Sequence, residues 1–232
     1  MDINIIAFAI EIIEVILYRI RHGGMIMFDI ERIQRCIANR EPRVMDVIYR
    51  YSVLIPMIDV DGQWEIIYQV RSKNLNRQPG EISFPGGGVE DGETYEEAAI
   101  RETMEELNMD RGNIDIVGGL DYIVSYSNSI IHSFLGIIDG IDLEDIVPCK
   151  DEVDSIFTIP LDLLAEVKPK TYYIDIETSL DKDFPYDLIP NGREYNWQRG
   201  RYPVYFYVYE DRIIWGHTAK ITKYFIDIIK GC

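Results

Sequence analysis

The stretch of sequence that decides the fold covers residues 84–108 and reads FPGGGVEDGETYEEAAIRETMEELN. A glycine-rich turn, a short acidic loop and a helix over residues 94–107 follow one another in it. On a helical wheel the helix separates into two faces. Ile100, Met104 and Leu107 share the apolar face, which we expect to pack on a sheet.

Three carboxylates gather on the opposite face of this helix, at i, i+3 and i+4: Glu102, Glu105 and Glu106. Like charges at these spacings repel, and a hard divalent cation removes the repulsion. Arg101 stands four residues from both Glu97 and Glu105, so we expect it to bridge them. A solvated acidic face on a surface helix is the alternative that these residues leave open.

The glycines before the helix are a second feature of this stretch. Gly86, Gly87 and Gly88 follow Pro85 directly. Without a Cβ, such a backbone can approach a metal or a phosphate closely. An ordinary tight turn explains the same residues, and the glycines alone do not decide between the two.

Seven residues fall at the fixed positions of the Nudix box, G-x5-E-x7-R-E-U-x-E-E-x-G-U, in which U is a bulky aliphatic residue: Gly87, Glu93, Arg101, Glu102, Glu105, Glu106 and Met109. The chain therefore resembles the Nudix hydrolases. Thr103 departs from the pattern at an aliphatic position, and Asn108 replaces the late glycine. Asparagine is the next best residue for the left-handed conformation that ends a helix, so we expect this departure to be harmless.

The resemblance implies a fold and a chemistry. The fold is a Nudix-like α/β/α sandwich with a mixed sheet between helices. The reaction is hydrolysis of a nucleoside diphosphate linked to another group, with Mg²⁺ or Mn²⁺ as cofactor. The metal ligands that it implies are Glu102, Glu105 and Glu106.

The resemblance also implies supporting and catalytic residues. Glu93 matches a carboxylate that holds the loop and Arg101. The general base is Glu105 or Glu152; for Glu152, a plain position at the edge of a strand is the more common situation of a surface carboxylate.

Residues 70–87, VRSKNLNRQPGEISFPGG, resemble the additional motif of the coenzyme A diphosphatase branch. The matching residues are Arg71, Ser72, Leu75, Gly80, Phe84, Pro85, Gly86 and Gly87. Segments 151–161 and 214–219 resemble the same branch. The expected reaction splits coenzyme A or an acyl derivative into 3′,5′-ADP and 4′-phosphopantetheine.

The expected substrate carries several phosphates, and a small basic cluster lies beside the glycine turn to bind them: Arg71, Lys73 and Arg77. A solvated hairpin loop is the alternative for these cations. Ser72, Gly86 and Gly87 complete the expected substrate-binding set. We interpret His217 as structural, at a turn or capping the last helix.

Two other functions stay open. One is a Nudix pyrophosphatase for another nucleoside diphosphate derivative, such as ADP-ribose, a nucleotide sugar or an oxidised nucleotide. The other is a catalytically silent module that binds a nucleotide. Silent modules usually lose carboxylates of the box, whereas Glu102, Glu105 and Glu106 are all present.

The composition limits partners and compartment. The 232 residues include 40 acidic and 23 basic ones, a net charge of −17, and 47% are hydrophobic. Such a chain can bury a core, and its field repels nucleic acid. Cys36, Cys149 and Cys232 are scattered, which argues against disulfides and a thiolate zinc site and favours a reducing cytoplasm.

The first residues form a separate region. Residues 3–20 are nearly all apolar, but two glutamates disfavour a membrane span and Asp2 disfavours a signal peptide. We expect a helix buried against the domain or a second copy of the chain, which would make a homodimer. The expected division is an extension over residues 1–24 and a Nudix domain over residues 25–232.

The remaining elements follow from apolar periodicity and turn residues. Strands are expected at residues 51–60, 64–70, 81–84, 114–120, 133–138, 153–159, 202–209 and 212–215. Helices are expected at residues 28–38, 94–107, 160–166 and 218–229. Helices mixed with hairpins indicate a mixed sheet covered on both faces.

Overall fold

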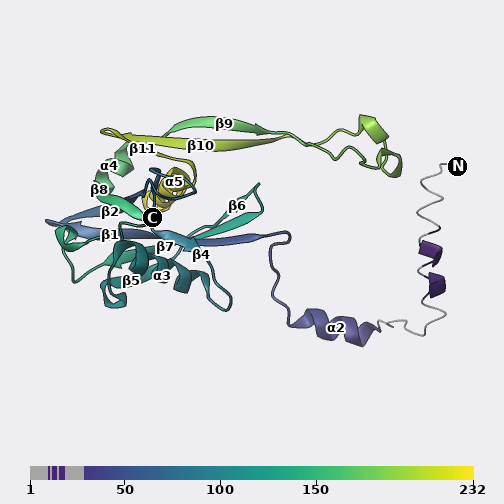
Figure 1. Cartoon of the computed structure of the whole chain (residues 1–232), viewed down its shortest axis with the longest axis horizontal. Helices are drawn as coiled ribbons and strands as arrows, with labels where there is room; N and C mark the ends of the chain where they lie inside the picture. Colours follow the sequence, from purple (N-terminus) through teal and green to yellow (C-terminus); the bar gives the residue numbers. More distant parts are fainter. Residues whose placement is uncertain (1–9, 11, 15, 19–28) are drawn as a thin grey trace. The chain divides into compact units, whose positions relative to one another are not determined.

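The computed structural model describes residues 10, 12–14, 16–18 and 29–232 (Figure 1). Its contacts divide the chain into two units. One comprises residues 1–44 and 175–201, and the other comprises residues 45–174 and 202–232. The second unit contains the whole stretch that decides the fold.

A mixed eight-stranded sheet forms the centre of the second unit. Its strands are β1 (Tyr49–Val60), β2 (Gln63–Arg71), β3 (Ile82–Ser83), β4 (Gly86–Gly88), β5 (Ile114–Gly119), β6 (Ile123–Ser125), β7 (Ser129–Ile138) and β8 (Val153–Pro160). β1 runs parallel to β7, whereas β2 and β4 pair with β1 in the antiparallel sense. The turn between β1 and β2 is Asp61-Gly62, and both residues have positive φ. The mixed sheet that we predicted is confirmed.

Both faces of this sheet are buried, because β1 and β2 are apolar at consecutive positions. Leu54 and Ile67 pack on one face, in the core that also holds residues of α3 (Tyr95–Leu107). Ile55 and Tyr68 pack on the other face, with residues of α4 (Leu161–Glu166) and α5 (Gly216–Gly231). Figure 1 shows α3 and α5 on opposite sides of the sheet.

A second, three-stranded sheet accompanies α5, and its strands are β9 (Lys170–Ile176), β10 (Gly200–Tyr209) and β11 (Arg212–Trp215) in the order β11-β10-β9. We predicted the hairpin of β10 and β11, but not β9 or a separate sheet. Tyr205 and Tyr207 of β10 join the core beneath α5. One covering layer of the sandwich therefore contains a small sheet as well as helices.

Four short 3₁₀ helices complete the described elements: η1 (Arg111–Asn113), η2 (Leu143–Asp145), η3 (Tyr186–Leu188) and η4 (Gly192–Glu194). The last two belong to the first unit, where Phe184 packs edge-on against Tyr186 and Trp197. That unit also contains α2 (Ile30–Ala38), which begins at Asp29, whose side chain accepts a hydrogen bond from the Arg32 N–H group at 2.6 Å. The predicted helix at residues 28–38 is thus confirmed from residue 30.

Most of the apolar stretch at residues 3–20 lies outside the described residues. Those of its residues that are described, 10, 12–14 and 16–18, are helical and exposed. The burial that we expected for this stretch stays a prediction, and so does the boundary at residue 24.

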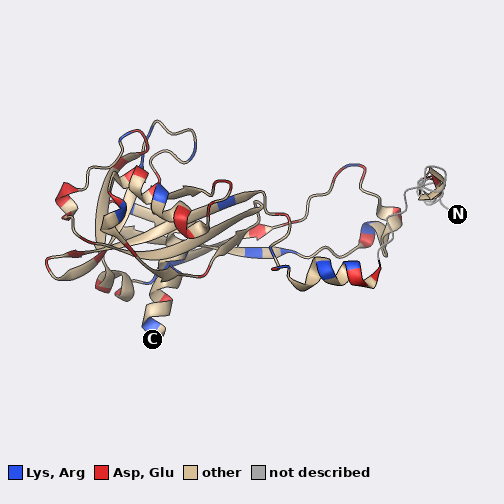
Figure 2. Ribbon diagram, turned by 90° about the horizontal axis from the view of Figure 1, so that it is seen from below, with Lys and Arg blue, Asp and Glu red and all other residues tan. Residues whose placement is uncertain are grey.

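Acidic residues are distributed over many helices and loops, and α2 carries both signs of charge (Figure 2). All three cysteines are free thiols. In the part of the chain that the structure describes, we find no helix with the length and apolar character needed to cross a membrane.

Candidate active site

Helix α3 owes its position to a cap at each end. Thr94 begins it with a capping box: its hydroxyl oxygen accepts from the Glu97 N–H group at 3.2 Å, and its own N–H group donates to Glu97 Oε2 at 2.8 Å. Asn108 ends it in the left-handed conformation, with φ at 51°. The expected role of Asn108 is confirmed.

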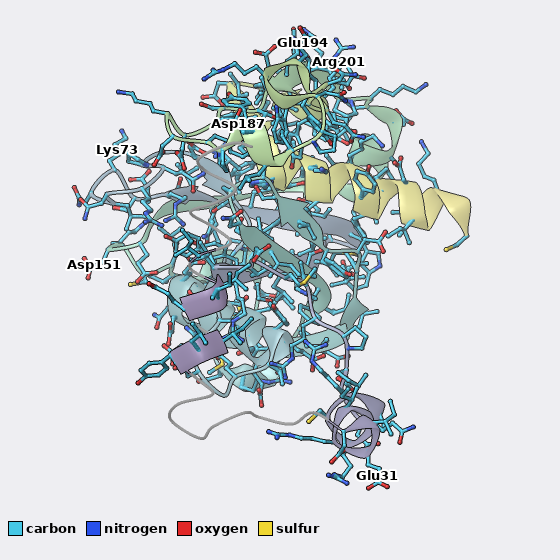
Figure 3. All side chains as sticks on the ribbon, turned by 90° about the vertical axis from the view of Figure 1, so that its right-hand side faces the viewer. Glu31, Lys73, Asp151, Asp187, Glu194 and Arg201 are labelled. Atoms are coloured by element: carbon cyan, nitrogen blue, oxygen red, sulfur yellow. The ribbon has the colours of Figure 1, made fainter. Side chains whose placement is uncertain are left out.

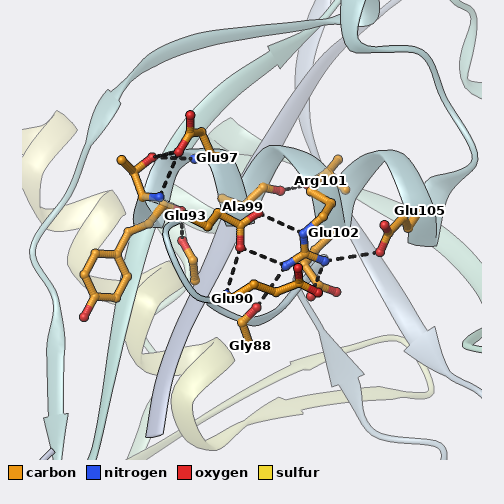
Figure 4. Close-up of polar contacts among 12 residues, drawn as sticks. Gly88, Glu90, Glu93, Glu97, Ala99, Arg101, Glu102 and Glu105 are labelled. Carbon is orange, nitrogen blue, oxygen red and sulfur yellow. Dashed lines mark hydrogen bonds and ion pairs between the residues drawn. The ribbon is translucent and has the colours of Figure 1, made fainter.

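Arg101 is the centre of a network on the exposed side of α3 (Figure 4). Its Nε and Nη2 donate to the two oxygens of Glu93 at 2.9 and 3.1 Å, and Nη2 also donates to the Gly88 carbonyl at 2.9 Å. Its Nη1 donates to Glu102 at 2.8 Å and to Glu105 at 3.3 Å. Our prediction that Arg101 bridges Glu97 was wrong, since Glu97 serves the capping box instead.

Glu93 ties the loop before α3 to Arg101. Besides its two contacts with the guanidinium, it accepts a hydrogen bond from the Glu90 N–H group at 3.0 Å. The bonds from Arg101 and Glu90 hold the pKa of Glu93 below its usual value, and Glu93 in turn raises the pKa of Arg101. Through these contacts Glu93 holds both the loop and Arg101.

Glu106 is buried, unlike the other carboxylates of the cluster. It is 2% exposed, and its Oε2 accepts from Gln69 Nε2 at 2.9 Å and from the Gly86 N–H group at 2.8 Å. Burial raises its pKa to about 7; the hydrogen bonds from Gln69 and Gly86 oppose this shift, and nearby Glu102 adds to it. Its other oxygen forms a long ion pair with Arg71 Nη1 at 4.0 Å, which lowers the pKa less than burial raises it.

The burial of Glu106 corrects the wheel analysis, which placed all three carboxylates on the face turned away from the sheet. Ala99, Thr103 and Glu106 lie at i, i+4 and i+7 and form one buried stripe along α3. Only the Glu105 side chain is largely exposed, at 59%. Glu102 lies between these extremes, and burial raises its pKa above the ordinary value.

Two glycines are required by close contacts at this site. A Cβ on Gly87 would lie 2.3 Å from the carboxyl carbon of Glu102, and one on Gly86 would lie 2.3 Å from the Ser52 carbonyl oxygen. Gly88, by contrast, has no atom within 4 Å of the same position. The backbone at residue 87 therefore leaves room for the Glu102 carboxylate and nothing more.

The donor atoms suit a hard divalent cation, but they are not gathered around one point. Among the described residues, no group of three His, Cys, Asp or Glu side chains is close enough to hold a metal ion. Glu102 and Glu105 are turned to Arg101, and Glu106 is turned to Gln69 and Gly86. The residues fit the chemistry of Mg²⁺ or Mn²⁺, because they supply carboxylate oxygens beside a glycine cradle. In the described part of the chain, the three carboxylates that the resemblance implies as metal ligands do not form a preformed site.

A family model described as the NUDIX domain matches residues 48–179. The chain belongs to the Nudix family. Nudix hydrolase 3 of Caenorhabditis elegans is 37% identical over 132 residues, 55% of this chain and 55% of that protein. The peroxisomal coenzyme A diphosphatase NUDT7 of Mus musculus is 32% identical over 136 residues, 58% of this chain and 56% of that protein. The chain thus spans about half the length of these relatives.

A solved structure of an Ap4A hydrolase from C. elegans, in a binary complex, also resembles this Nudix chain. It is 21% identical, with a TM-score of 0.41, and the match covers 48% of this chain and 80% of the solved chain.

Only part of the expected substrate-binding set lies beside the Nudix helix. Arg71 stands next to Glu106, and the buried Ser72 donates its N–H group to the Glu152 carbonyl at 2.8 Å. Lys73 and Arg77 are exposed on the loop after β2, and Figure 3 shows Lys73 extending into solvent. The basic cluster therefore has one member at the acids and two on the loop.

The two remaining candidate residues, Glu152 and His217, lie on different elements. Glu152 is exposed at the turn before β8, and its charge contributes to the raised pKa of Glu102. His217 lies in the first turn of α5 but does not cap it: the N-cap is Trp215, which makes no side-chain hydrogen bond to the helix. Of the two structural roles expected for His217, at a turn or as the cap of the last helix, the cap was wrong.

Gln69 is the site residue that sequence reasoning missed. It is fully buried on β2 and donates to Glu106. The available signal was one amide within the apolar run Ile66-Ile-Tyr-Gln-Val70, because a polar residue in a strand that is buried on both faces needs a partner.

A pocket with a volume of 450 Å³ adjoins the site from the face that carries α5. Arg71, Gly86 and Gly87 line it together with residues of β10 and α5. The site therefore continues from the acids of the Nudix helix into a cavity large enough for a small molecule.

Proposed function

We propose that this protein is a divalent-metal-dependent hydrolase that cleaves the diphosphate bond of coenzyme A or its derivatives. The products would be 3′,5′-ADP and 4′-phosphopantetheine, formed by adding one water across the phosphoanhydride. The observation that carries the proposal is Glu106, a buried carboxylate whose ion pair with Arg71 is long, at 4.0 Å, in the same turn as Glu102 and beside Gly86.

The acids of α3 and of the loop before it outnumber the cations that face them. Glu93, Glu102 and Glu105 share Arg101, while Glu106 has Arg71 at 4.0 Å. A divalent ion held by Glu102, Glu105 and Glu106 would neutralise the diphosphate and favour ionisation of a bound water. For this, Glu102 and Glu105 must exchange Arg101 for the ion, and the bonds from Arg101 to Glu93 and Gly88 keep the guanidinium beside them.

Coenzyme A is supported as the substrate by the stretch before the Nudix helix and by the similarity to a coenzyme A diphosphatase. Arg71 would contact the diphosphate, since a guanidinium makes forked contacts with phosphate oxygens. Lys73 and Arg77, exposed on the adjoining loop, would contact the outer phosphate. Gly86 and Gly87 would allow the diphosphate to approach the backbone.

Two exposed carboxylates are candidates for the general base. Glu105 lies in the cluster itself, and Glu152 lies near enough to influence Glu102. Either could accept a proton from an attacking water that lies within hydrogen-bond reach. A homodimer and a cytoplasmic location remain part of the proposal.

The test is to incubate the protein with coenzyme A and Mg²⁺ and to identify the products by mass. The key variant is Glu106→Gln, which keeps the shape of the side chain. The control is Glu96→Gln, which removes the same charge from an exposed position in the first turn of the same helix. We expect both products from the unchanged protein and from Glu96→Gln, and almost none from Glu106→Gln.

The other outcomes are equally specific. Equal turnover by Glu106→Gln would remove Glu106 from the mechanism. Faster hydrolysis of ADP-ribose, a nucleotide sugar or an oxidised nucleotide in the same assay would favour another Nudix pyrophosphatase. Binding without turnover in Mg²⁺ would favour the silent module.

A further inference from the structure

Several residues that line the pocket beside the acidic site carry buried polar atoms with no hydrogen-bond partner in the protein. Across the described residues, four buried side-chain nitrogen or oxygen atoms make no hydrogen bond. Three of them belong to residues that line this one pocket: Arg71 Nε, Tyr202 Oη and His217 Nδ1. These atoms are shielded in the structure, and an unpaired buried polar group is costly; rotation of the side chains toward a molecule in the pocket would let that molecule pair them.

The wall of the pocket is aromatic. Its aromatic side chains come from five different elements or loops, and they are Tyr51, Phe84, Tyr126, Tyr202 and Trp215. Tyr202 meets Tyr126 edge to face, with ring centroids 5.5 Å apart, and the Lys220 ammonium lies 4.2 Å from its ring centre. Tyr202 is thus held in place by its neighbours, as a recognition residue must be.

An aromatic wall with a few hydrogen-bonding groups suits a planar base better than a flexible chain. A nucleobase gains from contact with aromatic rings and presents donors and acceptors along its edge. A tyrosine hydroxyl and an imidazole nitrogen can each donate or accept, so they can pair with such an edge. The pantetheine arm of coenzyme A offers no ring to contact the wall.

We infer that this pocket binds the adenine half of the substrate, and that Tyr202 and His217 are residues that determine specificity for the base. This inference rests on the proposed function, because it assigns one half of coenzyme A to the pocket. Arg71 connects the two regions: it lines the pocket and lies beside Glu106. A base in the pocket therefore leaves the diphosphate next to the acids of α3.

Calorimetric titration of the full-length protein tests the inference without relying on turnover. The probes are adenosine 3′,5′-bisphosphate and 4′-phosphopantetheine, each added in the presence of Mg²⁺. Tyr202→Phe and His217→Phe keep a ring and remove the polar atom. We expect each to weaken binding of adenosine 3′,5′-bisphosphate by about 3- to 10-fold, as loss of one hydrogen bond does, and to leave 4′-phosphopantetheine unaffected.

The matched control is Tyr172→Phe, which removes a hydroxyl from an exposed tyrosine of β9 outside the pocket. It should change neither affinity. A second measurement uses the unchanged protein alone: adenosine 5′-monophosphate should bind at least about five times more tightly than ribose 5-phosphate, which lacks the base. Equal binding of these two compounds would overturn the inference, even if the variants unfolded.

The outcomes separate this inference from the proposed function. If coenzyme A is hydrolysed but Tyr202→Phe and His217→Phe weaken only 4′-phosphopantetheine, or neither probe, the pocket does not hold adenine. If coenzyme A is not hydrolysed but both variants bind adenosine 3′,5′-bisphosphate more weakly than the unchanged protein does, the pocket inference stands and the proposed reaction fails. With coenzyme A as substrate, the same variants should raise KM more than they lower kcat.

Discussion

At the scale of single residues, Gly87 provides the sharpest test of the site. A methyl group at this position would overlap the carboxylate of Glu102, whereas one at Gly88 would meet nothing within 4 Å. Since Glu102 is a flexible side chain, Gly87→Ala should displace it without unfolding the protein. We expect turnover of coenzyme A to fall by about 10- to 100-fold in Gly87→Ala.

Gly88→Ala is the control for this prediction, and it should keep full turnover. The measurement is the initial rate of hydrolysis, accompanied by a thermal unfolding midpoint for each variant. Equal rates in Gly87→Ala and Gly88→Ala would mean that the position of Glu102 is unimportant.

The sequence predicted these residues unevenly. The resemblance to the Nudix box identified Glu93, Arg101, Glu102, Glu105 and Glu106, and helical spacing brought Glu102, Glu105 and Glu106 into one turn. It did not show that Glu106 is buried while Glu105 is exposed. That difference depends on how deeply α3 lies on the sheet and on Gln69, which comes from another strand.

At the scale of elements, Asn108 sets the end of α3, just after the acidic turn that carries Glu102, Glu105 and Glu106. Asn108 ends the helix with φ at 51°, a conformation that costs a residue with an ordinary Cβ. Asn108→Ala should lower the free energy of unfolding by about 1 kcal/mol, and Asn108→Gly should equal or exceed the unchanged protein. Urea denaturation of the two variants and the unchanged protein measures these differences. An Asn108→Ala variant that is more stable than the unchanged protein would contradict the prediction.

The side chain of His132 on β7 predicts a pH dependence of stability. Its ring lies between Tyr95 and Tyr122, with centroids 3.7 and 4.8 Å away. Burial lowers its pKa below the ordinary value of 6.5, so the folded protein favours the neutral ring. The stability gained from this shift is complete above pH 6.5 and is lost as the pH falls through the folded pKa.

His132→Phe keeps a ring between the two tyrosines and removes the titration. Its urea midpoint should therefore fall less between about pH 7.5 and about pH 5.5 than that of the unchanged protein. Parallel curves for the two proteins would show that His132 does not titrate differently on folding.

Strands and helices with clear periodicity were predicted well, and those without it were not. β1, β2, β8 and α5 follow from apolar runs and turn residues. β4 consists of Gly86–Gly88, which has no strand propensity and pairs because β1 lies alongside. β9 was missed because all of its residues but the last are exposed, and its alternation of apolar and polar residues is weak.

At the scale of the whole molecule, the prediction to test is that residues 1–24 form an extension separate from the Nudix domain. The described residues of the apolar stretch are exposed, and the family match begins at residue 48. We expect a chain that starts at Met25 to keep its turnover of coenzyme A but to have a lower unfolding midpoint, because the removed segment is expected to pack on the domain or on a second copy of the chain. Gel filtration of both forms would show whether the removed segment holds two copies together.

A loss of turnover in the shortened chain would contradict the boundary at residue 24.

The net charge of −17 is also a property of the whole molecule. It disfavours anionic ligands in general, so binding of a phosphate-rich substrate must depend on local cations and a metal ion.

The central claim is that the acidic turn of α3 holds a divalent ion, and Mn²⁺ binding followed by electron paramagnetic resonance tests it most directly. The three proteins to compare are the unchanged chain, Glu106→Gln and the matched control Glu96→Gln. We predict that Glu106→Gln weakens Mn²⁺ binding by at least about tenfold, while Glu96→Gln binds as the unchanged protein does. Equal binding by all three, or no binding by the unchanged protein, would contradict the claim.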